Sequence, residues 1–120
     1  MTVNFNAAAL SAADLEESLL TPPSAQPLDR DITVRSRVYF TDEDHGLIAG
    51  TWESEPGAAR WEFTERGEII TVISGSMTVM EDDSEPVLLG PGDTAYFPLG
   101  WTGIWTVHER LRKAFVVYTK

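Results

Sequence analysis

The sequence contains no cysteine and only two histidines among its 120 residues. Without cysteine the chain can form no disulfide, offers no thiolate to a metal and has no cysteine nucleophile. Basic residues are also few: nine lysines and arginines face nineteen aspartates and glutamates, which gives a formal net charge of −10. This excess of negative charge repels phosphate backbones and anionic lipid surfaces. We therefore expect neither a nucleic acid nor a membrane as a partner.

Long apolar runs are absent as well. No stretch approaches the roughly eighteen apolar residues that a membrane-spanning helix needs. The N-terminal segment MTVNFNAAALSAADLEESLL has no basic leader, and it carries Asp14, Glu16 and Glu17 where a signal peptide needs an apolar run. On these grounds we expect a cytoplasmic protein.

What the sequence does contain is enough apolar material for one compact domain. Hydrophobic residues make up 42% of the chain and charged residues 23%, and the aromatic residues include 4 Trp and 5 Phe. A domain of this size buries roughly two-thirds of the surface that its unfolded chain exposes. The length therefore suits one domain and is too short for two.

The first part of the chain reads as an appendage to this domain. Ser11 can cap a short helix over residues 12–20, in which alanine and leucine recur at helical spacing before two consecutive prolines end it. The segment TPPSAQPLDRD that follows is rich in proline and poor in apolar residues. It predicts an extended connector on the surface.

From residue 32 onward, short β-branched or aromatic runs alternate with clusters of Gly, Pro, Asp and Glu. The runs include ITVRSRVYF, GLIAGTW, ARWEFT, EIITVIS, SMTVM, TAYFP, GIWTV and KAFVVYT. Many short strands at close spacing predict a sandwich or a barrel. EIITVIS is apolar on both alternations, which is typical of a strand with neither face in water. Glycines at 75 and 92 predict sharp turns with positive φ.

The order of several motifs resembles the cupin family. These motifs are Pro56-Gly57 before a strand, Glu68 followed by Gly75, GPGD at 90–93, then Pro98, Gly100 and Trp101. More narrowly, GTWESEPGAARWEF, PGDTAYFPLGWTGIWTV and RKAFVVY resemble the (S)-ureidoglycine aminohydrolase cupin domain and the ethanolamine-utilisation cupins. The resemblance implies an all-β fold: a single small antiparallel cupin barrel of the RmlC-like jelly-roll type with a short N-terminal helix. Residues 1–31 would form the helix and connector, and residues 32–120 the barrel.

The chain departs from the metal-binding members of this family. Those cupins place two histidines shortly before the motif glutamate and a third after the glycine of the second motif. The first two positions here hold Trp61 and Phe63, or Glu62 and Thr64 in the other register, and the third falls near Gly103. Of the four usual ligands only Glu68 remains, and one carboxylate does not hold a transition metal against water.

The two histidines do not replace the missing ligands in the sequence. His45 in DEDHG and His108 in VHERL lie in apparent turns, where an exposed histidine is expected. We therefore expect neither a metal nor another cofactor. One alternative stays open, a metal site assembled from Glu62, Glu65, Glu68 and a histidine from elsewhere in the chain.

An aromatic barrel mouth with a few polar groups is the usual site for a small-molecule ligand. The candidate wall residues are Trp61, Phe63, Phe97, Trp101 and Trp105. Because aromatic residues also dominate small cores, we expect two or three of these five to serve the core alone. Arg60 is a candidate for clamping a carboxylate and Tyr96 for hydrogen bonding to a substrate.

Glu68 and Lys113 are the candidate catalytic residues. Glu68 either pairs with a cationic side chain at the surface or faces the apolar barrel, where it could serve as a general acid or base. Lys113 opens the KAFVVYT run, where the simplest expectation is a solvated charge that discourages edge pairing. Turned toward the barrel, it could instead bind a carboxylate or form a Schiff base.

Two functions from different classes follow from these residues. One is a small cupin that binds an amino- or carboxylate-bearing metabolite, with Glu68 as acid or base; the resemblance to the ureidoglycine aminohydrolase group suggests nitrogen-metabolite chemistry. The other is a non-catalytic ligand-binding or interaction module on the same scaffold. Cupins commonly pair through the barrel edge, so we also expect a homodimer.

Overall fold

The computed structural model describes residues 2–119. Within them, no helix has the length and apolar character needed to cross a membrane. The elements are η1 (Ala12–Asp14), β1 (Glu16–Leu19), β2 (Ala25–Pro27), β3 (Thr33–Asp42), β4 (Leu47–Ser54), β5 (Gly57–Glu62), β6 (Arg66–Glu81), β7 (Val87–Leu89), β8 (Thr94–Phe97) and β9 (Thr102–Thr119).

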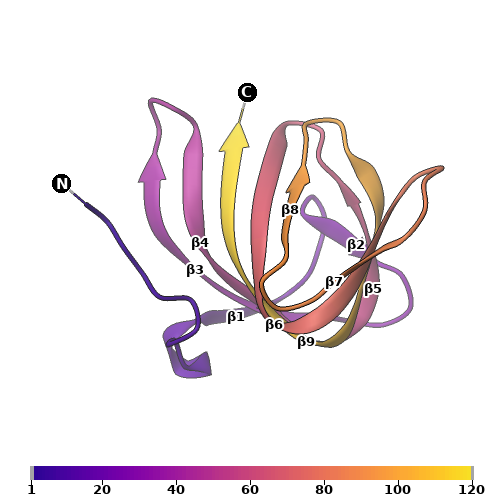
Figure 1. Cartoon of the computed structure of the whole chain (residues 1–120), viewed down its shortest axis with the longest axis horizontal. Coiled ribbons are helices and arrows are strands. Elements are labelled where there is room, and N and C mark those ends of the chain that lie inside the picture. The colour runs from indigo at the N-terminus through magenta and orange to yellow at the C-terminus, as the bar shows by residue number, and fades with distance from the viewer. Residues whose placement is uncertain (1, 120) are drawn as a thin grey trace.

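The strands form one antiparallel sheet that curls into a barrel, with β3 and β4 on one side and β5 and β7 on the other (Figure 1). The order along the sheet is β1-β3-β4-β9-β5-β2, while β6 pairs with β7, β8 and β9. The two longest strands, β6 and β9, pair along most of their length and bend together. The short apolar runs predict a sandwich or a barrel, and the antiparallel barrel that the resemblance to the cupins implies is confirmed.

Gly75 lies inside β6 and joins the runs EIITVIS and SMTVM into one strand. Its φ is +84°, and the register against β9 shifts on both sides of it, which marks a β-bulge. The expected positive φ is confirmed, but the glycine bends a continuous strand and does not end it. Gly92, with φ +90°, does lie in a turn, where the Asp93 carboxylate accepts a hydrogen bond from the Gly90 N–H over 2.8 Å.

The helix predicted over residues 12–20 is wrong. Only the single 3-10 turn η1 forms, and the Asp14 carboxylate accepts a hydrogen bond from the Ser11 N–H at its start, over 2.9 Å. The chain then extends as β1, which pairs with β3. A helix this short is marginal without packing. The backbone hydrogen bonds that β3 offers at its edge stabilise a strand instead.

The segment after β1 is mostly exposed, as the proline-rich composition suggests, yet it also contributes to the barrel. Leu20 and Ala25 are buried in the main core cluster. Ala25 begins β2, which pairs with β5 across from Trp61. Residues 18–24 therefore lie at one opening of the barrel, beside the cavity described in the next subsection.

Most core side chains come from β5, β6 and β9, and the other strands of the barrel and their connections add a few more. All five aromatic residues considered as cavity walls are buried, and each residue is only 0–6% exposed: Trp61, Phe63, Phe97, Trp101 and Trp105. Trp61 stacks on Trp105 with ring centroids 4.1 Å apart, and Phe63 stacks on Phe97 at 5.6 Å. This aromatic stack fixes the interior wall against which the site is built.

The outer face of the barrel carries some exposed apolar residues. Ile69 on β6 lies across from Tyr96 on β8 and from Val116 on β9, and all three are exposed. The expected homodimer stays a prediction, which a measurement of molecular mass in solution would test.

Candidate functional site

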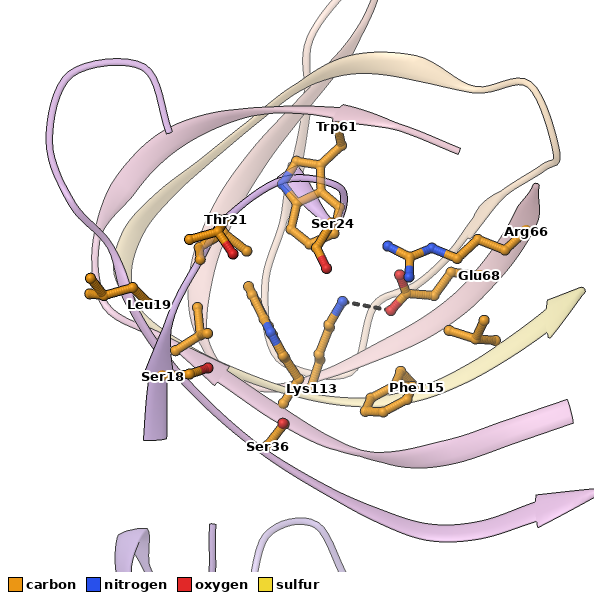
Figure 2. Close-up of a pocket in the computed structure, with 14 residues that line it drawn as sticks. Ser18, Leu19, Thr21, Ser24, Ser36, Trp61, Arg66, Glu68, Lys113 and Phe115 are labelled. Atoms are coloured by element: carbon orange, nitrogen blue, oxygen red, sulfur yellow. Dashed lines mark hydrogen bonds and ion pairs between the residues drawn. The ribbon is translucent and has the colours of Figure 1, made fainter. Parts of the chain in front are cut away.

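Two charged side chains meet inside the barrel. Glu68 projects inward from β6 and Lys113 from β9, and the Lys113 Nζ donates a hydrogen bond to Glu68 Oε2 over 2.6 Å (Figure 2). Their side chains are only 5% and 2% exposed. The expectation of a solvated Lys113 at a strand edge is therefore wrong. The residue lies well inside β9 and not at the start of a strand, and the inward face of the barrel decides its environment.

Three indole rings surround the Lys113 ammonium group. The nitrogen lies 4.5 Å from the ring centroid of Trp52, 4.5 Å from that of Trp105 and 5.7 Å from that of Trp61. The negative faces of aromatic rings attract a cation at such distances, and more strongly where water is excluded. The ammonium is thus held by Glu68 and by aromatic faces, with no open contact to bulk solvent.

Burial changes the proton affinity of this lysine. The loss of solvation lowers the pKa of Lys113 below its ordinary value of 10.5, while the charge and hydrogen bond of Glu68 act in the opposite direction without cancelling the effect. The nearby Arg66 guanidinium lowers the pKa further. Lys113 therefore releases its proton at a lower pH than a solvated lysine does.

The pair lies at the wall of a cavity of about 370 Å³. The apolar part of the lining is Leu19, Leu20, Val34, Trp52, Trp61, Phe115 and Val117, and the polar part is Ser18, Thr21, Ser24, Ser36, Arg66, Glu68 and Lys113. The charged lining groups are two cations and one carboxylate, a net charge of +1. A cavity of this sign stands out in a chain whose net charge is −10.

Arg66 stands at the mouth of the cavity. Figure 2 shows its guanidinium on the same side as the Glu68 carboxyl group. Within residues 2–119 it forms no salt bridge, although it lies over the ring of Phe63 with 5.7 Å to the centroid. Arg66 and Ser24 also line an outer hollow of about 570 Å³, so they stand where the two spaces meet.

The structure separates the predicted wall residues into two groups. Trp61 lines the cavity directly, and Trp105 contacts the Lys113 ammonium from behind. Phe63, Phe97 and Trp101 do not line this cavity; Phe97 and Trp101 instead border a smaller hollow of about 240 Å³ near β7. Which of the five contact a ligand stays a prediction.

The two polar candidates for ligand binding lie outside the cavity. Arg60 forms an exposed salt bridge with Asp82, with 2.8 Å between Nη2 and Oδ2, and this contact holds the pKa of Asp82 at about 2. Tyr96 is 56% exposed, and its hydroxyl hydrogen-bonds to that of Tyr118 over 2.6 Å. Neither side chain belongs to the lining around Lys113.

Sequence reasoning missed several lining residues. Trp52 and Phe115 lie on β4 and β9, in apolar runs whose alternation alone does not say which face turns inward. Thr21 and Ser24 were not predicted as lining residues because their segment was expected to be a connector on the surface. The one available signal was the apolar pair Leu19-Leu20, which a strand places on opposite sides.

The residues present do not fit the histidine-rich metal centre of other cupins. At the expected ligand positions Trp61 and Phe63 present buried rings, and the remaining ligand, Glu68, is engaged by Lys113. No group of three or more histidine, cysteine, aspartate or glutamate side chains that could hold a metal ion occurs among the described residues. The alternative site from three glutamates is therefore not assembled, since Glu62 and Glu65 are exposed while Glu68 faces inward.

Both histidines lie outside the cavity. His45 occupies an exposed turn, as expected, with its Nδ1 2.9 Å from Asp42 Oδ2. His108 was expected in a turn but lies within β9, where its Nε2 is 2.7 Å from the Thr78 hydroxyl on the exposed outer face. The residues of VHERL that suggested a turn lie where β9 bends alongside the β-bulge of β6.

Comparisons with known proteins bear on the whole barrel. The sequence model of the EutQ-like cupin domain matches residues 41–115. No curated protein sequence matches the chain significantly. Among solved structures, the EutQ protein of Clostridium difficile is similar with 25% identity and a TM-score of 0.63, over 73% of this chain and 69% of that one.

Two further structures show the same fold at lower sequence identity. A protein of unknown function of the DUF861 family from Pseudomonas syringae has 23% identity and a TM-score of 0.75 over 86% of this chain. The match covers only 43% of that longer chain. Ectoine synthase from P. lautus has 14% identity and a TM-score of 0.66, over 78% of this chain and 69% of that one.

Proposed function

We propose that this chain, which belongs to the EutQ-like cupin domain family, binds a small carboxylate-bearing metabolite in the cavity beside Lys113, with Glu68 as the proton-transfer group. A fold supports many functions, so the cavity and not the family carries the argument.

The charge of the cavity is the observation that carries this proposal. Lys113 already neutralises Glu68, which leaves the Arg66 guanidinium as the cationic group at the mouth. A guanidinium binds a carboxylate through two parallel hydrogen bonds. A ligand ammonium would instead meet two cations and a carboxylate that is already paired. The arrangement thus favours a carboxylate over an amine.

The size and walls of the cavity support a small, partly apolar ligand. Its volume of about 370 Å³ is near the lower end of ordinary ligand pockets, which span roughly 300–1,000 Å³. Trp52, Trp61 and Phe115 can bury the apolar part of such a ligand, and the hydroxyls of Thr21 and Ser24 can orient its polar part. Figure 2 shows the Ser24 hydroxyl directed into the cavity.

The buried hydrogen bond between Glu68 and Lys113 supports acid–base chemistry over a purely structural scaffold. The Lys113 Nζ lies 2.6 Å from Glu68 Oε2, so a proton can pass along this hydrogen bond without rearrangement. A buried ionisable group with a shifted pKa and a specific charged partner in a cavity, such as Lys113, is typical of functional sites.

Binding can be tested by thermal shift and calorimetry with acetate, propionate and lactate, each compared with its uncharged amide. We expect only the carboxylates to raise the Tm. At a ligand concentration of 100 Kd the free energy of unfolding should rise by about 2.7 kcal/mol. Arg66→Gln should remove this gain. Arg60→Gln is the matched control, because Arg60 pairs with Asp82 outside the cavity. Equal binding of amides, or equal loss in both variants, would refute the proposal.

A further inference from the structure

We propose that Lys113 is a carbonyl-condensing amine, which forms a Schiff base with a small oxo acid whose carboxylate lies against Arg66. This inference rests on the proposed function and deepens it, because it names the substrate class. It also assigns a covalent role to a residue that would otherwise serve only as the partner of Glu68.

The position of the amine carries the inference. The Lys113 side chain lines the cavity although only 2% of it is exposed, so a carbonyl compound would meet it from the cavity side. Its hydrogen-bond acceptor, Glu68 Oε2, lies 2.6 Å away. An amine needs to be neutral to attack a carbonyl carbon, and Glu68 is placed to accept the proton that the ammonium must first release. Burial also lowers the pKa of Lys113.

The reaction balances with these two residues and the carbonyl compound. The Lys113 ammonium passes one proton to Glu68, and the free amine attacks the carbonyl carbon. The C–N bond forms as the C=O π bond opens, and one proton moves from the nitrogen to the oxygen to give a neutral carbinolamine. Glu68 returns its proton to the hydroxyl group, the C–O bond breaks and water leaves. The product is a protonated Schiff base on Lys113 beside an ionised Glu68, and no oxidant or reductant is consumed.

The surroundings of the nitrogen already suit this product. A protonated Schiff base carries one positive charge on the nitrogen, as the ammonium does. Trp52 and Trp105, each with its ring centroid 4.5 Å from that nitrogen, stabilise such a charge, and the carboxylate of Glu68 compensates it. Arg66 at the mouth distinguishes an oxo acid from a simple aldehyde, because only the acid carries a carboxylate for its guanidinium.

The sequence makes this proposal easy to test, because Lys113 and Lys120 are its only lysines. The full-length protein would be incubated at neutral pH with pyruvate and sodium cyanoborohydride, which reduces a Schiff base to a stable secondary amine. Intact mass and peptide mapping would then locate the adduct. We expect one adduct per chain, on Lys113. It should persist in Lys120→Arg and vanish in the double variant Glu68→Leu/Lys113→Met.

Four outcomes would overturn the inference or part of its basis. Labelling confined to Lys120 and the N-terminal amine would refute it in the wild-type protein, whatever the folding of the variants. If acetaldehyde labels Lys113 as readily as pyruvate, the assignment to an oxo acid is wrong. If lactate and propionate bind in an Arg66-dependent way but pyruvate does not label Lys113, the binding function stands and the covalent role fails. Labelling of Lys113 without any carboxylate binding would instead refute the binding function.

Discussion

Lys113 and Glu68 lie where each depends on the other, since both are almost fully buried and joined by one hydrogen bond. Moving two charges out of water is costly, and the pair compensates that cost only while both members are present. The energetic consequences of changing one member or both therefore differ sharply.

We predict that Lys113→Met lowers the free energy of unfolding by about 3–5 kcal/mol, because it leaves the Glu68 carboxylate buried without its cation. The double variant Glu68→Leu/Lys113→Met removes both charges at similar volume and should be close to the wild type in stability. Urea denaturation measures both changes. Equal losses in the single and the double variant would show that the pair is not coupled as the 2.6 Å contact indicates.

The lowered pKa of Lys113 predicts a specific pH dependence of stability. In the unfolded chain this lysine has its ordinary pKa of 10.5, and burial lowers the pKa in the folded state. Between the two values the unfolded chain binds more protons, so the contribution of Lys113 to stability rises with pH up to about 10.5 and is constant below the folded-state value. The stability difference between wild type and the double variant, measured from about pH 7 to pH 10, should shift in favour of the wild type. A difference that does not change with pH would contradict this expectation.

At the scale of elements, the β-bulge in β6 lets one continuous strand bend and pair with β7, β8 and β9. Gly75 has φ +84°, and a Cβ placed there would lie 2.0 Å from the carbonyl oxygen of Arg110. The neighbouring strand β9 therefore approaches the bulge too closely for any side chain at this position.

Gly75→Ala should destabilise the protein more than Gly92→Ala. Both glycines have positive φ, which costs an alanine roughly 1–2 kcal/mol. At Gly92, a Cβ would meet no heavy atom within 4 Å among the described residues, so the difference between the variants measures the clash with Arg110. Denaturant unfolding provides both values. Equal costs would mean that β9 moves aside without penalty.

The segment from β1 to β2 is expected to be an integral part of the barrel. Leu20 is 6% exposed within the core cluster, whereas its neighbour Leu19 is 52% exposed. Leu20→Ala should therefore cost about 2–5 kcal/mol. Leu19→Ala, the matched control, should stay within about 0.5 kcal/mol. If chemical denaturation shows no difference between the two, the segment does not pack as the structure indicates.

At the scale of the whole molecule, the cation beside Glu68 inside the barrel is the ammonium of Lys113. Trp61 and Phe63 stand at the positions where the resemblance to metal-binding cupins implies histidines, and both are buried. No group of three or more His, Cys, Asp or Glu side chains that could hold a metal ion occurs among residues 2–119, so we expect the stability of the fold to be independent of metal.

We predict that protein purified without a metal-affinity tag contains no stoichiometric transition metal and that EDTA leaves its Tm unchanged. Elemental analysis and thermal denaturation with and without EDTA measure this directly. About one Mn, Fe, Ni or Zn per chain, lost in Glu68→Ala, would contradict the prediction and would restore a metal-dependent mechanism.

Local patterns in the sequence were sufficient to predict the fold class. Short alternating runs separated by turn residues predict a sandwich or a barrel, and the resemblance to the cupins narrows this to an antiparallel barrel. The positive φ of Gly75 and Gly92 was expected where the chain must turn sharply. The resemblance to the cupins made Glu68 a candidate through its motif position, and Lys113 was a candidate at the start of the KAFVVYT run. Composition alone predicted the net charge and the lack of thiol chemistry.

Only the tertiary structure decided which way these candidates face and what they meet. A shift of one residue in strand register moves a side chain from the interior to the solvent, so the sequence alone favoured the solvated position of Lys113 that the structure overturns. Its contact with Glu68 joins residues 45 positions apart, and its contact with Trp52 joins two strands whose pairing no local pattern specifies. The same holds for residues 16–19, where hydrogen bonds from β3 outweigh a weak helical preference. The site is thus a product of long-range pairing, which local propensity does not encode.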